Sequence, residues 1–150
     1  MKKIILMILL ATTVAFAQQG PAPGNAPKSQ AKVLSRAEFD ALIANPAKIL
    51  IIDVRRPDEL TANGGFPVYL SIQAKDLEKS LAWIPKDREI ITVSNHAARG
   101  GIAADLLTKN GFKVAGTIGA QTYEQGGGKL TKIVPPPPPP ATANGEKKGS

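Results

Sequence analysis

Two continuous apolar runs place the strongest constraint on the fold of this 150-residue chain. They are KILIIDV at 48–54 and EIITVS at 89–94. Neither run alternates apolar with polar residues, and this is the pattern of a strand buried on both faces of a parallel sheet. FKVAGTI at 112–118 is expected to form a third strand, and PVYLSI at 67–72 a shorter one.

Helical patterns separate these strands. Ser35 and Glu38 have the spacing of a capping box, which predicts a helix that ends before Pro46. We expect Trp83 and Tyr123 to be at least partly buried. Strands that alternate with helices indicate a single α/β domain, with a parallel central sheet flanked by helices on both faces. A further helix is expected to start at 57–60. The remaining expected helices cover 74–84, 99–110 and 120–125.

The two ends of the chain differ from this body in composition. Residues 1–17 combine two lysines, a thirteen-residue apolar run and a small-x-small motif, which is typical of a Sec-type signal peptide. We therefore expect a bacterial protein that is periplasmic or secreted, with no membrane insertion after signal cleavage. Residues 18–32 have the composition of a flexible linker, and 135–150 begin with six prolines, which favour polyproline II followed by a disordered tail. The predicted domain is 33–134.

Composition excludes several kinds of chemistry. The chain has no cysteine, which rules out disulfides, thiolate nucleophiles, cysteine-based zinc sites and iron–sulfur clusters. We expect neither a metal nor another cofactor. The net charge of +7 is spread over the two ends, because 33–134 holds 13 basic and 11 acidic residues. A nucleic-acid site needs a clustered basic face, so no nucleic-acid partner is expected.

The order of the motifs resembles that of rhodanese-like domains. The resemblance begins with IIDVRRPDEL, continues through GGFPV and DREIITVS, and ends with RGGIAADLLTKNGFKVAGTIGA. It covers essentially all of 33–134. The residues that match the family motifs are Asp53, Val54, Arg55, Pro57, Glu59, Gly64, Pro67, Gly111, Phe112 and Gly119.

The resemblance also implies an active-site loop of six residues that begins with a cysteine. In this chain Ser94 stands in the position of that cysteine. Serine cannot carry a persulfide, and its hydroxyl is far harder to ionise than a thiol. The resemblance therefore implies a pseudoenzyme without sulfurtransferase or phosphatase activity, which acts as an anion-binding or protein-binding accessory module. The loop and the residue after it are Ser94, Asn95, His96, Ala97, Ala98, Arg99 and Gly100.

Other uses of this loop stay open. Ser94 could act as the nucleophile of a hydrolase or transferase with His96 as its base, which needs a third group to orient the imidazole. The chain could also be an active sulfurtransferase-family member with unusual chemistry. Backbone amides at a helix N-terminus, together with Arg99, favour a small anion such as sulfate, phosphate or thiosulfate. Asp53 is expected to support the loop by accepting backbone hydrogen bonds or pairing with Arg55.

A protein partner is the remaining expectation. The six prolines at 135–140 could dock in an aromatic groove of another protein, or act as a stiff spacer.

Overall fold

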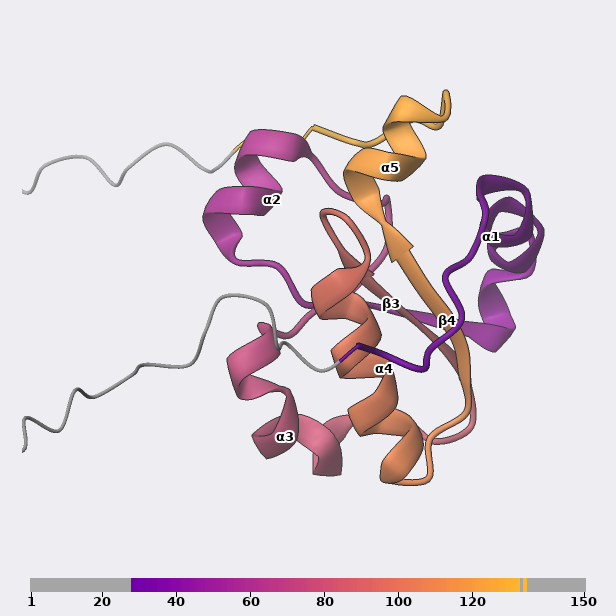
Figure 1. Cartoon of the computed structure of the whole chain (residues 1–150), viewed down its shortest axis with the longest axis vertical. Coiled ribbons are helices and arrows are strands. Elements are labelled where there is room, and N and C mark those ends of the chain that lie inside the picture. Colours follow the sequence, from indigo (N-terminus) through magenta and orange to yellow (C-terminus); the bar gives the residue numbers. More distant parts are fainter. Residues whose placement is uncertain (1–27, 133, 135–150) are drawn as a thin grey trace, which may run out of the picture.

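A computed structural model describes residues 28–132 and residue 134 (Figure 1). Four parallel strands form one sheet in the order β2-β1-β3-β4, which confirms the predicted α/β domain with a parallel sheet. The expected signal peptide, most of the expected linker and the proline-rich tail at 135–150 lie outside the described residues. The strands are β1 (Ile49–Asp53), β2 (Leu70–Ser71), β3 (Glu89–Ser94) and β4 (Val114–Gly119).

Within residues 28–132, five α-helices connect and cover the strands. The capping box of the first is present, because Ser35 N donates to Glu38 Oε2 at 2.9 Å and Glu38 N donates to Ser35 Oγ at 3.3 Å. No helix within the described part of the chain is long and apolar enough to cross a membrane. The helices are α1 (Arg36–Ile43), α2 (Pro57–Asn63), α3 (Leu77–Ser80), α4 (Ala98–Lys109) and α5 (Ala120–Gln125), with short 3-10 turns η1 (Pro46–Lys48), η2 (Ala74–Asp76) and η3 (Leu81–Trp83).

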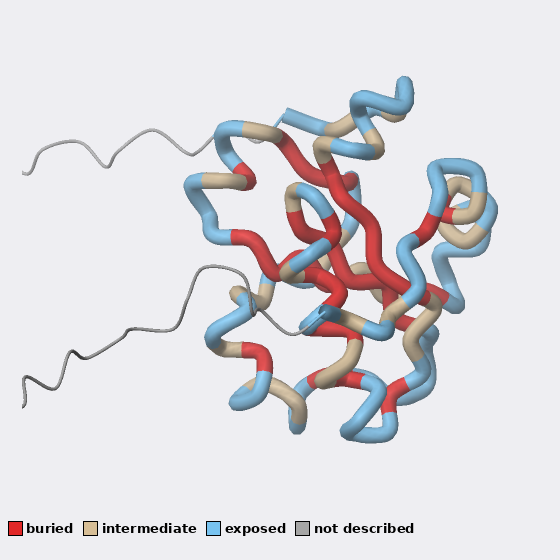
Figure 2. Tube along the Cα trace, in the orientation of Figure 1, coloured by how far each residue is buried: buried red, intermediate tan, exposed pale blue. Residues whose placement is uncertain are grey.

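The sheet separates two hydrophobic cores. Figure 2 shows that the buried residues lie in the inner segments of the chain. On one face, Phe39 of α1 packs with Phe66 and with Tyr123 of α5, at ring-centroid distances of 4.5 and 5.3 Å. On the other face, Leu77 of α3 and Leu107 of α4 pack against the strands. Both faces of the sheet are covered, which is why β1 and β3 read as unbroken apolar runs.

Two local expectations differ from the structure. The strand expected over 67–72 is reduced to the two residues that pair with the end of β1, and Pro67 at its expected start has no N–H to donate to a sheet. The helix expected over 74–84 has a single α-helical turn between two 3-10 turns. That change of pitch moves Trp83 off the apolar face, and its side chain is 83% exposed, so the prediction that it is buried was wrong.

The segment before residue 33 contacts the domain at the β4 edge of the sheet. Thr117 N donates to Lys32 O at 2.8 Å, and Leu34 N donates to Thr117 O at 2.8 Å. Gln30 N donates to Asp105 Oδ2 of α4 at 3.0 Å. The expected linker 18–32 therefore includes residues that pack on the domain and cover this edge.

Neighbouring glycines of α4 provide a test of this packing. A Cβ at Gly100 would lie 2.3 Å from the buried Thr117 Oγ1, whereas the closest atom to a Cβ at Gly101 is Ser29 Oγ, at 2.7 Å. We expect Gly100→Ala to lower the free energy of unfolding by about 1–3 kcal/mol, because the core must shift. Gly101→Ala is expected to cost less, because it displaces Ser29 of the terminal segment rather than a buried strand residue, and alanine favours the helix by about 1 kcal/mol.

Urea unfolding of both variants would check this pair of expectations. Equal stabilities of the two variants would contradict the tight contact between α4 and β4.

Candidate functional site

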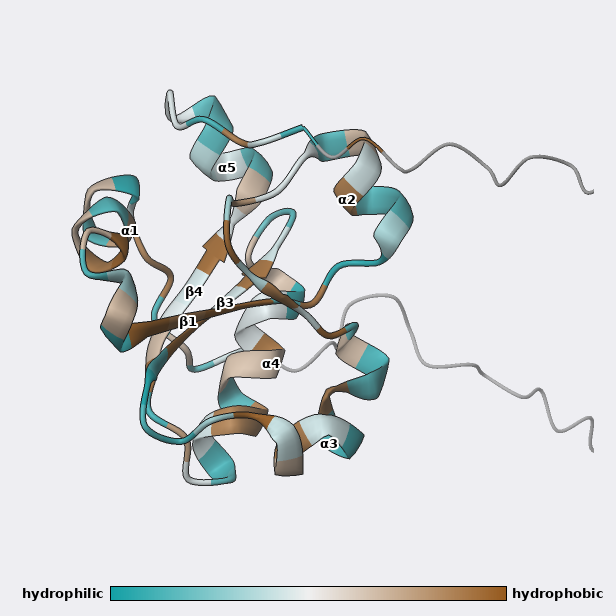
Figure 3. Ribbon diagram, turned by 180° about the vertical axis from the view of Figure 1, so that it is seen from behind, coloured by the Kyte–Doolittle hydropathy of each residue, from teal (hydrophilic) through white to brown (hydrophobic). Residues whose placement is uncertain are grey.

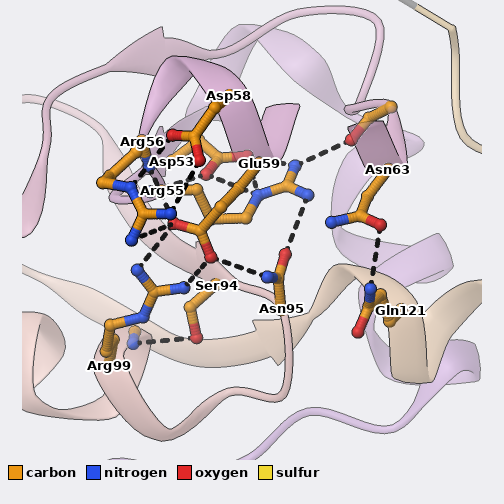
Figure 4. A network of polar contacts seen from close by, with 12 residues as sticks. Asp53, Arg55, Arg56, Asp58, Glu59, Asn63, Ser94, Asn95, Arg99 and Gln121 are labelled. Atoms are coloured by element: carbon orange, nitrogen blue, oxygen red, sulfur yellow. Dashed lines mark hydrogen bonds and ion pairs between the residues drawn. The ribbon is translucent and has the colours of Figure 1, made fainter. Parts of the chain in front are cut away.

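The candidate site is the loop between β3 and α4, at the carboxyl ends of the strands (Figure 4). Ala97, just before the first residue of α4, has φ of 66°, in the left-handed region. This turn directs the first amides of α4 back toward the end of β3. Gly101 N then donates to Ala97 O at 2.7 Å, which closes the first turn of the helix.

Ser94 lies beneath this turn and is only 1% exposed. Its Oγ accepts a hydrogen bond from Gly100 N at 3.1 Å. The hydroxyl therefore occupies the place in front of the helix N-terminus, and it engages one of the amides that an anion would need. Of the sequence-predicted loop residues, Ser94 and Gly100 are thus brought together.

Two buried threonines hold the start of α4 to the sheet. Thr92 Oγ1 donates to Gly100 O at 2.8 Å, and Thr117 Oγ1 donates to Ala97 O, just before α4, at 3.4 Å. Both side chains are almost fully buried. Sequence reasoning missed them, although a hydroxyl residue within each of two apolar runs was a signal that the backbone there needs a polar partner.

Asp53 and Arg55 form an ion pair beside the loop, and both side chains are 0% exposed. Arg55 Nε and Nη2 donate to the two carboxylate oxygens of Asp53 at 3.0 and 2.7 Å. The same guanidinium donates to Gly64 O at 3.0 Å and to Asn95 Oδ1 at 3.2 Å. A buried charge is tolerated only when its hydrogen bonds are complete, and the side-chain donors and acceptors buried here all have partners.

The Arg99 guanidinium, which was expected to help hold an anion, forms an ion pair with Glu59 of α2. Arg99 Nη1 donates to Glu59 Oε2 at 2.8 Å, while Asn95 Nδ2 donates to Glu59 Oε1 at 2.8 Å. The hydrogen bond from Arg99 holds the pKa of the Glu59 carboxyl down at about 2. Glu59 matched the family motif, but its contact with the loop was not foreseen, because two segments 40 residues apart must meet to make it.

His96 and Ser94 are not brought together as a base and a nucleophile. His96 is exposed, whereas Ser94 is buried. Within the described residues no hydrogen bond joins the two, and Ser94 Oγ has Gly100 N as its partner. The described part of the chain also holds no group of three His, Cys, Asp or Glu side chains placed to bind a metal ion.

The buried ion pair yields a stability prediction. Asp53→Asn would leave the Arg55 guanidinium buried without its counter-ion, and such a loss costs about 3–5 kcal/mol of unfolding free energy. Asp58→Asn is the control, because Asp58 forms a solvent-exposed ion pair with Arg56. The Asp58→Asn variant should have nearly the same unfolding free energy as the unchanged protein. Thermal and urea unfolding would measure both. Equal stabilities would contradict the role assigned to the Asp53–Arg55 pair.

The depressed pKa of Glu59 yields a pH prediction. Its pKa in the folded state is about 2 against an ordinary value of 4.5. A carboxyl with a lowered folded pKa stabilises the fold above pH 4.5 and loses that contribution as the pH falls toward 2. The difference in unfolding free energy between the unchanged protein and Glu59→Gln should therefore be largest at neutral pH and shrink through this window.

Urea titrations at a series of pH values would measure that difference. Glu38 also has a pKa of about 2, lowered first by its hydrogen bond with Lys32, so Glu38→Gln should show the same pH dependence and is a positive control for the measurement. A Glu59→Gln difference that did not change with pH would contradict the ion pair with Arg99.

No family model matches this sequence, and no curated protein matches it. Solved structures do match. A rhodanese-related protein from Thermoplasma volcanium is 20% identical, with a TM-score of 0.59 over 68% of this chain and 99% of that one. A protein from Rhodopseudomonas palustris, described as a possible tyrosine phosphatase, is 24% identical, with a TM-score of 0.59 over 67% of this chain and 85% of that one.

A thiosulfate sulfurtransferase from Pseudomonas aeruginosa is 24% identical to this chain, with a TM-score of 0.56. The match covers 67% of this chain but 20% of the sulfurtransferase. This chain has the rhodanese-like fold.

Proposed function

We propose that this chain is an exported rhodanese-like domain that transfers no sulfur and acts as an accessory binding module. One observation carries the proposal, namely that Ser94 stands where the rhodanese-like pattern has its cysteine, in a chain without any cysteine. Export is part of the proposal because 1–17 has the composition of a secretory signal peptide.

The chemistry of sulfur transfer explains why this one position matters. A thiolate attacks the outer sulfur of thiosulfate, forms a sulfur–sulfur bond and releases sulfite. The cysteine thiol suits this step because its pKa is near 8.5 and a helix N-terminus lowers it further. The Ser94 hydroxyl offers no comparable nucleophile, and its oxygen is engaged by Gly100 N at 3.1 Å. The same argument applies to a cysteine-dependent phosphatase.

The contacts of the loop favour binding of a protein over tight binding of an anion. One amide of the α4 N-terminus bonds to Ser94, and the Arg99 guanidinium is paired with Glu59. An anion would have to compete with both. His96 and Ala98 remain exposed at the tip of the loop, where a partner protein could contact them.

The proposal predicts that the purified protein transfers no sulfur from thiosulfate to cyanide above the blank rate. Ser94→Cys is expected to gain the mass of one sulfur atom on treatment with thiosulfate, because the surrounding backbone keeps the shape of the loop. Ser94→Ala is the matched control and should gain none. Intact-mass spectrometry and a colorimetric thiocyanate assay would measure these outcomes.

Sulfur transfer by the unchanged protein, in a sample free of contaminating sulfurtransferase, would overturn the proposed function. A Ser94→Cys variant that takes up no sulfur would show instead that the loop has lost its geometry as well as its nucleophile.

A further inference from the structure

An apolar cavity of about 430 Å³ lies beside the start of β1, away from the loop at Ser94. Its walls come from the end of α1, from the first half of β1 and from the segment 66–70 that leads into β2. Figure 3 shows β1 as a strongly hydrophobic ribbon. We call this feature the β1 groove and define it by Ile49, Ile51, Phe66, Val68, Leu70 and Arg88.

The β1 groove coincides with an unpaired stretch of sheet edge. On one side, β1 pairs with β3 along its whole length. On the other side, β2 pairs only with Ile52 and Asp53. Within the described residues, Ile49–Ile51 therefore have no neighbouring strand on the groove side. The opposite edge of the sheet is covered, because the segment 32–34 hydrogen-bonds to Thr117 of β4.

The side chains around the groove define what could occupy it. Val68 is 81% exposed and Leu70 is 38% exposed, over a floor that includes the buried Phe66. Arg88 is the single charged residue of the lining, and its side chain forms no ion pair in the part of the chain that the structure describes. An occupant with aliphatic side chains and a carboxylate would complement this surface.

We propose that the β1 groove binds an extended segment of a partner protein, which adds as a strand to the free half of β1. Its aliphatic side chains enter the cavity, and a carboxylate at one end pairs with Arg88. Strand addition of this kind gains affinity from backbone hydrogen bonds and specificity from pockets for alternate side chains. Three residues of β1 span roughly 10 Å, which suits a segment of about four residues.

A peptide fits the groove better than a fatty acid does. The free half of β1 presents backbone N–H and C=O groups along the groove, and covering such groups without hydrogen bonds is costly. An acyl chain would cover them and supply no partners, whereas an extended peptide supplies one donor and one acceptor per residue. The proposal concerns a surface separate from the Ser94 loop and does not depend on the proposed function.

Fluorescence anisotropy of the full chain with labelled peptides would test the groove. The probes are two hexapeptides with valine at alternate positions and a single glutamate, placed first in one peptide and last in the other. We expect at least one to bind saturably with a dissociation constant below about 1 mM. The same peptide with N-methylated amides facing β1 should not bind, because it keeps the side chains and loses the hydrogen bonds.

Three variants refine the test. Arg88→Glu should lower the affinity for the peptide that contains glutamate about fivefold. The same variant should raise the affinity for a matched peptide in which lysine replaces the glutamate. Val68→Ser should lower the affinity for the glutamate peptide about fivefold, because apolar contact with the peptide is lost. Trp83→Ser is the control, because Trp83 is 83% exposed but does not line the groove, and its variant should bind like the unchanged protein.

Several results would overturn the inference. These are the absence of saturable binding, equal affinity for the N-methylated peptide, or affinities that neither Arg88→Glu nor Val68→Ser changes. Displacement of the peptide by low concentrations of decanoate, without any effect of amide methylation, would assign the groove to an apolar carboxylate instead. None of these outcomes would affect the sulfur-transfer assay, so the two proposals fail separately.

Discussion

The buried ion pair between Asp53 and Arg55 is the interaction on which the end of the sheet depends. It joins the last residue of β1 to the start of the α2 segment, and the same guanidinium reaches Gly64 O after α2 and Asn95 in the β3–α4 loop. Three chain segments thus share one buried cation. Each of the three segments accepts hydrogen bonds from the same guanidinium. Loss of the Arg55 side chain would leave their buried acceptors unpaired, and loss of one acceptor would leave part of the guanidinium unpaired.

A second layer of polar contacts fixes the loop from the helix side. Thr92 and Thr117 bond to carbonyls around the first turn of α4, and the Glu59 carboxylate holds Arg99 and Asn95 together from α2. Ser94 contributes one hydrogen bond to this arrangement. The shape of the loop therefore rests mainly on residues other than Ser94.

The sequence was informative where one local pattern was enough. Unbroken apolar runs predicted β1 and β3, the Ser35–Glu38 spacing predicted the start of α1, and the last helix was predicted with its observed bounds, 120–125. It was less informative where geometry depends on distant partners. The length of β2 depends on how the chain after Pro67 meets β1, and the exposure of Trp83 depends on a change of helical pitch.

The same distinction holds for the candidate site. The position of Asp53 at the end of a strand was enough to predict that it supports the loop or pairs with Arg55, and the pair with Arg55 is present. The pairing of Arg99 with Glu59 could not be predicted from the sequence. The two residues are 40 positions apart, and nothing in the sequence distinguishes such a pair from two separate charged residues in solvent. That contact changes the electrostatics of the site, since it places a carboxylate beside the cation that was expected to attract an anion.

The two surfaces considered for binding lie at opposite ends of the sheet. The loop follows the last residues of β1 and β3, whereas the β1 groove is lined by Ile49 at the start of β1 and by Arg88 just before β3. Five residues of β1 separate the two ends by roughly 16 Å. A short peptide added to β1 would therefore leave His96 and the loop open. Under the two proposals, the domain would hold one partner at the groove while the loop stays accessible to another.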